Sequence, residues 1–132
     1  MTPPRWLFWH RRDLRLADNR GLAAAAAATP AVTGVFVLDP AILSEPTMAP
    51  ARLWFLSESL GELQQSWQQA GSRLLILNGD PAELLPRLAT ALSAEVVAWN
   101  RDVEPFGRER DRRVSRALQA DGRKVLADWD QL

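Results

Sequence analysis

Short apolar runs alternate along this chain with longer segments in which apolar residues recur every three or four positions. Each run is too short for a helix, and several are apolar without alternation, as in strands that are covered on both faces. The pattern therefore predicts the strands of a parallel sheet. We expect these strands at Trp6–Trp9, Val32–Leu38, Leu74–Leu77, Val96–Trp99 and Val125–Ala127.

The segments between the runs predict helices. The clearest one carries Trp67 and several leucines spaced by three and four residues, which gives a helix a single apolar stripe. Six consecutive alanines favour a second helix, and Pro81 suits the first turn of a third. We expect helices at residues 19–28, at about 50–70, from Pro81 onward and at 107–121.

Alternation of strands and helices with short connections requires right-handed crossovers and places helices on both faces of the sheet. The expected fold class is α/β, a Rossmann-like doubly wound parallel sheet of five strands in the order 3-2-1-4-5. A chain of 132 residues, of which 47% are hydrophobic, is long enough to bury one hydrophobic core. We therefore expect residues 1–132 to form a single domain.

Two charged loops follow the first and fourth expected strands, at residues 10–15 and 100–105. In this fold, ligands bind beyond the carboxyl ends of the strands, where neighbouring loops diverge. We expect cations of the first loop to face carboxylates of the second, with Asp102 and Glu104 in a ligand role. For Asp13 and Arg15 we favour pairing within the turn, together with Asp18, since ion pairs within loops are common.

Composition excludes several other functions. Sixteen basic residues balance sixteen acidic ones, so the chain has no net charge that would attract it to nucleic acid. The arginines of residues 108–116 are interleaved with acidic residues, which is typical of a solvated helix face. Without cysteine and with one histidine, we expect no metal site and a reducing, cytoplasmic location. The N-terminus lacks the pattern of a signal peptide. No apolar run approaches the roughly 20 residues needed to cross a bilayer, so nothing in the sequence indicates secretion or a membrane.

Motifs for common catalytic and cofactor sites are also absent. Neither the glycine-rich dinucleotide fingerprint nor a phosphate loop occurs, and His10 has no partner serine or cysteine in a nucleophile setting. We expect a structural hydrogen bond for His10. The residue Asp80 is expected to cap a helix.

Five stretches of sequence resemble the N-terminal α/β domain of the DNA photolyase and cryptochrome flavoproteins. The strings R-x-D-L-R-x-x-D-N and W-N-x-D-x-E-P are long enough to make chance agreement of both remote. The stretches are LFWHRRDLRLADNRGL (7–22), VFVLDP (35–40), MAPARLWFL (48–56), LLILNGDP (74–81) and WNRDVEPFGRERD (99–111). Similarity in MAPAR and NRDVEP is strongest to the deazaflavin-type photolyases.

The resemblance implies an antenna domain that holds a light-harvesting pigment and passes excitation to FAD in a following helical domain. The FAD then donates an electron to a pyrimidine dimer in damaged DNA. The implied pigment is 8-hydroxy-5-deazaflavin, with methenyltetrahydrofolate, a reduced folate, as the alternative. The implied pigment-binding residues are His10, Arg11, Arg12, Phe36, Leu38, Met48, Arg52, Asp102 and Glu104.

Within this set, Phe36, Leu38 and Met48 would form an apolar slot for a flat ring system, and Asp102 and Glu104 would hydrogen-bond the polar edge of the pigment. The sequence stops at Leu132, before the family's FAD- and DNA-binding domain. We therefore expect no repair activity from these residues alone and a reduced affinity for pigment. A cryptochrome-type photoreceptor and a stand-alone nucleotide-binding module are the alternatives, and the oligomeric state stays open.

Overall fold

The computed structural model of the chain describes residues 3–11, 14–40, 50–101 and 105–128. In this part of the chain a parallel sheet of five strands has the order β3-β2-β1-β4-β5, which confirms the predicted fold class and topology. The strands lie within a few residues of the expected bounds, at β1 Arg5–His10, β2 Ala31–Leu38, β3 Leu74–Asn78, β4 Ala94–Asn100 and β5 Lys124–Asp128.

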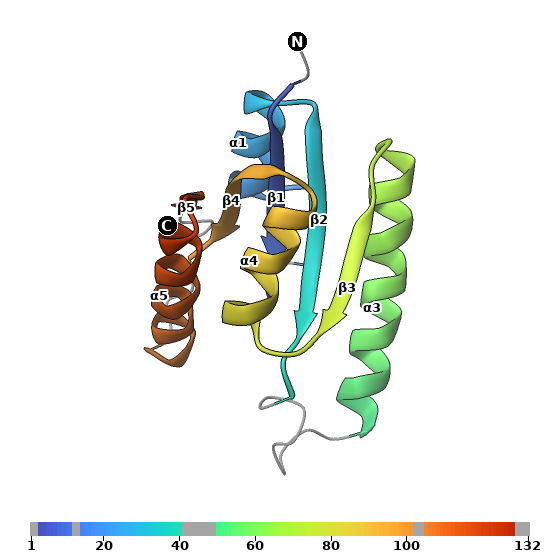
Figure 1. The fold of residues 1–132 in the computed structure, drawn as a ribbon. Helices are drawn as coiled ribbons and strands as arrows, with labels where there is room; N and C mark the ends of the chain where they lie inside the picture. Colours follow the sequence, from blue (N-terminus) through green and yellow to red (C-terminus); the bar gives the residue numbers. More distant parts are fainter. Residues whose placement is uncertain (1–2, 12–13, 41–49, 102–104, 129–132) are drawn as a thin grey trace.

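The described helices cover both faces of this sheet (Figure 1). α4 and α5 lie against one face, which we call the α4/α5 face, and α1 and α3 lie against the other, the α1/α3 face. Both faces are therefore removed from water, as the unbroken apolar runs predicted. The bounds are α1 Arg20–Ala28, α3 Pro50–Gln69, α4 Pro81–Ala91 and α5 Pro105–Ala120.

The central strand β1 contributes to both cores. Leu7 and Trp9 are buried on the α4/α5 face, whereas Phe8 is buried on the α1/α3 face. Successive side chains of a strand point to opposite faces, so four consecutive large apolar residues are compatible only with a strand that is covered on both sides. This accounts for the apolar run at the start of the chain.

Helix starts follow local capping chemistry. Asn19 caps α1, where its side-chain oxygen accepts a hydrogen bond from the Leu22 amide at 3.1 Å. Asp80 caps α4 in the same way by accepting from the Ala82 amide at 3.0 Å, as the sequence predicted. Each cap satisfies a main-chain donor that the first helical turn leaves unpaired.

The tightest contact between a helix and the sheet involves Trp67 of α3 and Gly34 of β2. A Cβ atom added to Gly34 would lie 2.5 Å from Cε2 of Trp67. The indole cannot easily move away, because its Nε1 donates a hydrogen bond to His10 Nε2 at 3.0 Å. Glycine is required here by close approach rather than by backbone conformation.

Gly34→Ala is expected to lower the free energy of unfolding by about 1–3 kcal/mol, because the added methyl group overpacks the Trp67 ring. Urea denaturation of the wild type and variant would measure the loss. Gly61→Ala is the matched control, since nothing lies within 4 Å of a Cβ at that position of α3. It should stabilise the protein by up to about 1 kcal/mol through helix propensity. Equal stability of Gly34→Ala and the wild type would contradict this account.

Candidate functional site

His10 ends β1 with a fully buried side chain on the α1/α3 face. Its Nε2 accepts the hydrogen bond from Trp67, and its ring meets those of Trp67 and Phe8 edge-on, at centroid distances of 5.7 Å and 4.9 Å. An accepting Nε2 places the proton of the neutral imidazole on Nδ1. The expected structural hydrogen bond of His10 is thus present, and it fixes one wall of the α1/α3 face at the carboxyl end of β1.

Phe36 and Leu38 lie beside His10 at the carboxyl end of β2. The register pairs His10 with Phe36, and both β2 side chains belong to the core of the α1/α3 face. Phe36 is buried, whereas Leu38 is half-buried at the end of the strand. The structure therefore brings three of the implied pigment-binding residues together as an apolar and aromatic wall.

Five further residues of the implied set are either exposed or lie outside the described residues. Arg52 is exposed in the first turn of α3, the helix that covers the α1/α3 face. Four of them lie outside the described residues, as does Asp13 of the first charged loop. These four are Arg12, Met48, Asp102 and Glu104.

Arg11 is placed on the opposite face of the sheet from His10. Its Nη1 lies 2.8 Å from each carboxylate oxygen of Asp111, and Nη2 donates to the Gly107 carbonyl at 3.5 Å. Its guanidinium also lies over the Trp9 ring, 5.0 Å from the centroid. The alternation of side chains along β1 explains the placement, because His10 and Arg11 are consecutive. Arg11 holds α5 to the end of β1 and is not brought together with Phe36 and Leu38.

Asn100, which sequence reasoning passed over, ties the end of β4 to the start of α1. Its Oδ1 accepts from the Gly21 amide at 2.9 Å, and its Nδ2 donates to Asn19 Oδ1 at 2.8 Å. Both asparagines are buried. The sequence signal that could have identified Asn100 is its position as a polar residue at the end of an otherwise largely apolar strand. This network joins the loop that follows β1 to the carboxyl end of β4, so the two expected loops do start from one edge of the sheet.

The turn after β1 is braced mainly through the backbone. Arg15 donates to the main-chain carbonyl of Asp18 at 2.9 Å, and Asn19 Nδ2 donates to the Arg15 carbonyl at 3.0 Å. Asp18 has a φ of 51°, in the left-handed region that aspartate tolerates. The bracing role expected for Arg15 is present, and a carbonyl oxygen of Asp18 is one of its acceptors.

Among the described residues, no group of three or more histidine, aspartate or glutamate side chains is arranged to hold a metal ion. Over the same part of the chain, no helix has the length and apolar character needed to cross a bilayer.

Comparison with known proteins identifies the family. The family described as DNA photolyase matches residues 6–132. The chain belongs to the DNA photolyase family. A deoxyribodipyrimidine photo-lyase of Synechococcus sp. is 58% identical over 126 residues, a match that covers 96% of this chain and 26% of that protein. The chain thus spans about a quarter of the length of this photolyase relative.

Solved structures share the fold of this photolyase-family chain. A cryptochrome from Synechocystis sp. PCC6803 has a TM-score of 0.89 at 29% identity, covering 98% of this chain and 28% of the cryptochrome. An archaeal photolyase from Sulfolobus tokodaii, whose structure is described as having two FAD molecules and as implying a novel light-harvesting cofactor, has a TM-score of 0.86 at 29% identity. That match covers 95% of this chain and 29% of the archaeal photolyase.

Asn100→Ala is expected to destabilise the photolyase-family chain by about 1–3 kcal/mol, because it leaves the buried Gly21 amide without its acceptor and removes one donor from Asn19 Oδ1. Urea denaturation would measure the loss, and faster hydrogen exchange at the Gly21 amide would locate it. Asn78→Ala is the control, since Asn78 also ends a strand but is exposed. Its effect should stay within about 0.5 kcal/mol. Similar effects of both variants would show that the Asn100 network contributes nothing.

Asp111→Asn should destabilise the chain by about 3 kcal/mol or more, because it leaves the guanidinium of Arg11 buried and uncompensated. The Arg11 side chain is 3% exposed and that of Asp111 is 13% exposed. Glu109→Gln removes one partner of an exposed ion pair with Arg112 and should cost less than about 1 kcal/mol. Thermal and urea unfolding of both variants test the difference, and a mild effect of Asp111→Asn would show that Arg11 is solvated.

Proposed function

We propose that this chain is the antenna domain of a DNA photolyase, which holds a flat light-harvesting pigment and passes its excitation to FAD held by another domain. The observation that carries the proposal is the family match over residues 6–132, together with 58% identity to a photolyase. The carboxyl edge of a doubly wound sheet is also where this fold binds ligands.

The described residues suit one side of such a pigment. Phe36, Leu38 and the His10 ring form an apolar and aromatic wall at the ends of β1 and β2. Apolar walls with a few convergent polar groups are typical of sites for flat organic molecules. The Trp67 hydrogen bond keeps the His10 ring in one orientation, so this wall is preformed rather than assembled on binding.

Polar contacts in the proposed site come from the two loops and from α3. Asp102 and Glu104 would accept hydrogen bonds from the polar edge of the pigment, and Arg12 and Arg52 would pair with its anionic groups. Met48 would complete the apolar slot. Arg11 would act as a positioning residue, because its ion pair with Asp111 fixes α5 against the end of β1.

The pigment that we propose is 8-hydroxy-5-deazaflavin, with methenyltetrahydrofolate as the alternative. The basis is the similarity of MAPAR and NRDVEP to deazaflavin-type photolyases. When bound, the pigment absorbs light and transfers the excitation, while the protein binds it, orients it and excludes water. Repair of pyrimidine dimers would then require FAD and DNA contacts from the further domain that the longer relatives suggest.

A cryptochrome-type photoreceptor is the second candidate function. It is supported by the similarity to the Synechocystis cryptochrome, which matches the fold as well as the photolyases do. The same pigment site would serve either protein. Repair of dimer-containing DNA by the full-length gene product would favour the photolyase, and photoreduction of FAD without repair would favour the photoreceptor.

Glu104→Gln is expected to weaken pigment binding about tenfold or more, because a charge-assisted hydrogen bond to the polar edge is lost. Titration of the chain with each pigment, followed by absorbance and fluorescence, would measure the dissociation constant. Glu95→Gln is the matched control, an exposed glutamate in the amino-terminal half of β4, and should leave binding unchanged. Tighter binding of the folate would overturn the pigment assignment. Failure of both pigments to bind, or no effect of Glu104→Gln, would overturn the site.

A further inference from the structure

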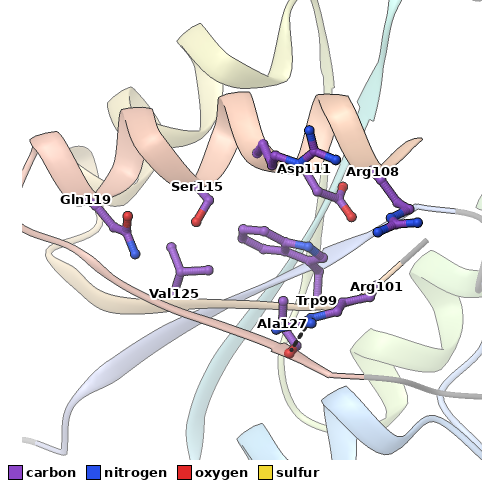
Figure 2. Close-up of a pocket in the computed structure, with 9 residues that line it drawn as sticks. Trp99, Arg101, Arg108, Asp111, Ser115, Gln119, Val125 and Ala127 are labelled. Atoms are coloured by element: carbon purple, nitrogen blue, oxygen red, sulfur yellow. Dashed lines mark hydrogen bonds between the residues drawn. The ribbon is translucent and has the colours of Figure 1, made fainter. Parts of the chain in front are cut away.

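A cleft lies on the α4/α5 face, between α5 and the edge strand β5 (Figure 2). Its volume is about 400 Å³, within the range of small-molecule sites. Trp99, Val125 and Ala127 form its apolar floor, and Arg101 and Arg108 also line it (Figure 2). Arg112 is a third arginine of the lining. The sheet separates this cleft from the wall formed by His10 and Phe36.

The indole of Trp99 carries a buried hydrogen-bond donor without a partner. Its side chain is 1% exposed, and Nε1 has no hydrogen-bond acceptor among the described residues. Figure 2 shows this nitrogen on the side of the cleft where Arg101 and Arg108 lie. Trp67, the buried tryptophan of the opposite face, has its Nε1 satisfied by His10. Buried indole donors normally find a partner, so the unpaired one points to an acceptor supplied by a ligand.

The charge around this donor favours an anionic acceptor. Arg101 is held over the cleft because its Nε donates to the Ala127 carbonyl of β5 at 3.2 Å. Arg108 is exposed and has no carboxylate partner among the described residues, whereas Arg112 pairs with Glu109. The one acidic side chain in the lining, Asp111, is neutralised by Arg11. The net charge of the lining is therefore positive.

We propose that this cleft binds a small phosphate ester that carries a flat ring, of the size of a mononucleotide. The phosphate would accept the Trp99 Nε1 hydrogen bond and pair with Arg101 and Arg108, whose planar guanidinium groups match phosphate oxygens. The flat ring would cover the apolar floor formed by Val125 and Ala127. The volume exceeds that needed for an inorganic anion alone, which is why a ring is included.

This site is independent of the proposed antenna function. It shares no residue with the implied pigment set, and the sheet separates it from His10, Phe36 and Leu38. Arg11 of that set lies on the same face as the cleft and contacts its lining through Asp111. Failure of the pigment to bind would not contradict ligand binding in this cleft, and failure of a ligand to bind in this cleft would not contradict pigment binding.

The test is an NMR titration of the 132-residue chain that follows the indole N–H resonance of Trp99. Trp99→Phe assigns that resonance by removing it from the spectrum. The probes are adenosine monophosphate, adenosine and inorganic phosphate, which separate the contribution of the ring from that of the charge. We expect saturable shifts with adenosine monophosphate, binding weaker by about tenfold or more with inorganic phosphate, and no saturation with adenosine.

Arg108→Gln should weaken binding of adenosine monophosphate about tenfold, because one charge-assisted contact to phosphate is lost. Arg116→Gln, at another exposed arginine of α5 that does not line the cleft, is the matched control and should bind like the wild type. Absence of a saturable shift at Trp99, or equal affinities of the two variants, would overturn the proposal. Equal affinities for inorganic phosphate and adenosine monophosphate would show an anion site without a ring pocket and would overturn it as well.

Discussion

The structure depends on the burial of β1 on both faces. Leu7 and Trp9 fill the core under α4 and α5, and Phe8 fills the core under α1 and α3. A strand in this position must be apolar at every residue, and it must exchange apolar for polar residues at the point where it leaves the sheet. His10 and Arg11 lie at that point, which is why the sequence changes from apolar to charged residues there. The strand pairs with β2 on one side and β4 on the other, so it is the central strand of the sheet.

Several buried polar side chains at the ends of the strands have a hydrogen-bond or ion-pair partner. Arg11 is matched by Asp111, Asn100 by Asn19 and Gly21, and the indole of Trp67 by His10. A buried charge or amide without a partner is costly, so each pair fixes the relative position of two elements far apart in the sequence. These contacts hold α5 and the start of α1 against the carboxyl edge.

The described residues on the two faces of the sheet suit two different kinds of ligand. On the α1/α3 face, the wall of His10, Phe36 and Leu38 is apolar and internally satisfied, which suits a rigid, flat pigment. On the α4/α5 face, the cleft beside β5 combines an unsatisfied indole donor with arginines, which suits an anion. The two sites that we propose therefore lie mainly on opposite faces of one sheet. Side chains alternate between these faces along each strand, which separates the two proposed sites.

The sequence by itself determined the architecture. Unbroken apolar runs, helical spacing around Trp67, six consecutive alanines and Pro81 predicted the strands and helices, because these signals are local. The alternation of strands and helices then predicted the strand order. The motifs around residues 7–22 and 99–111 also determined the family. What only the tertiary structure decided were the partners: that Arg11 turns to Asp111 rather than toward Phe36, that Asn100 reaches Asn19, and that Trp99 lacks an acceptor where Trp67 has one. These pairs join residues up to 100 positions apart. Periodicity assigns a side chain to a face, but only packing of the helices decides which group it meets there.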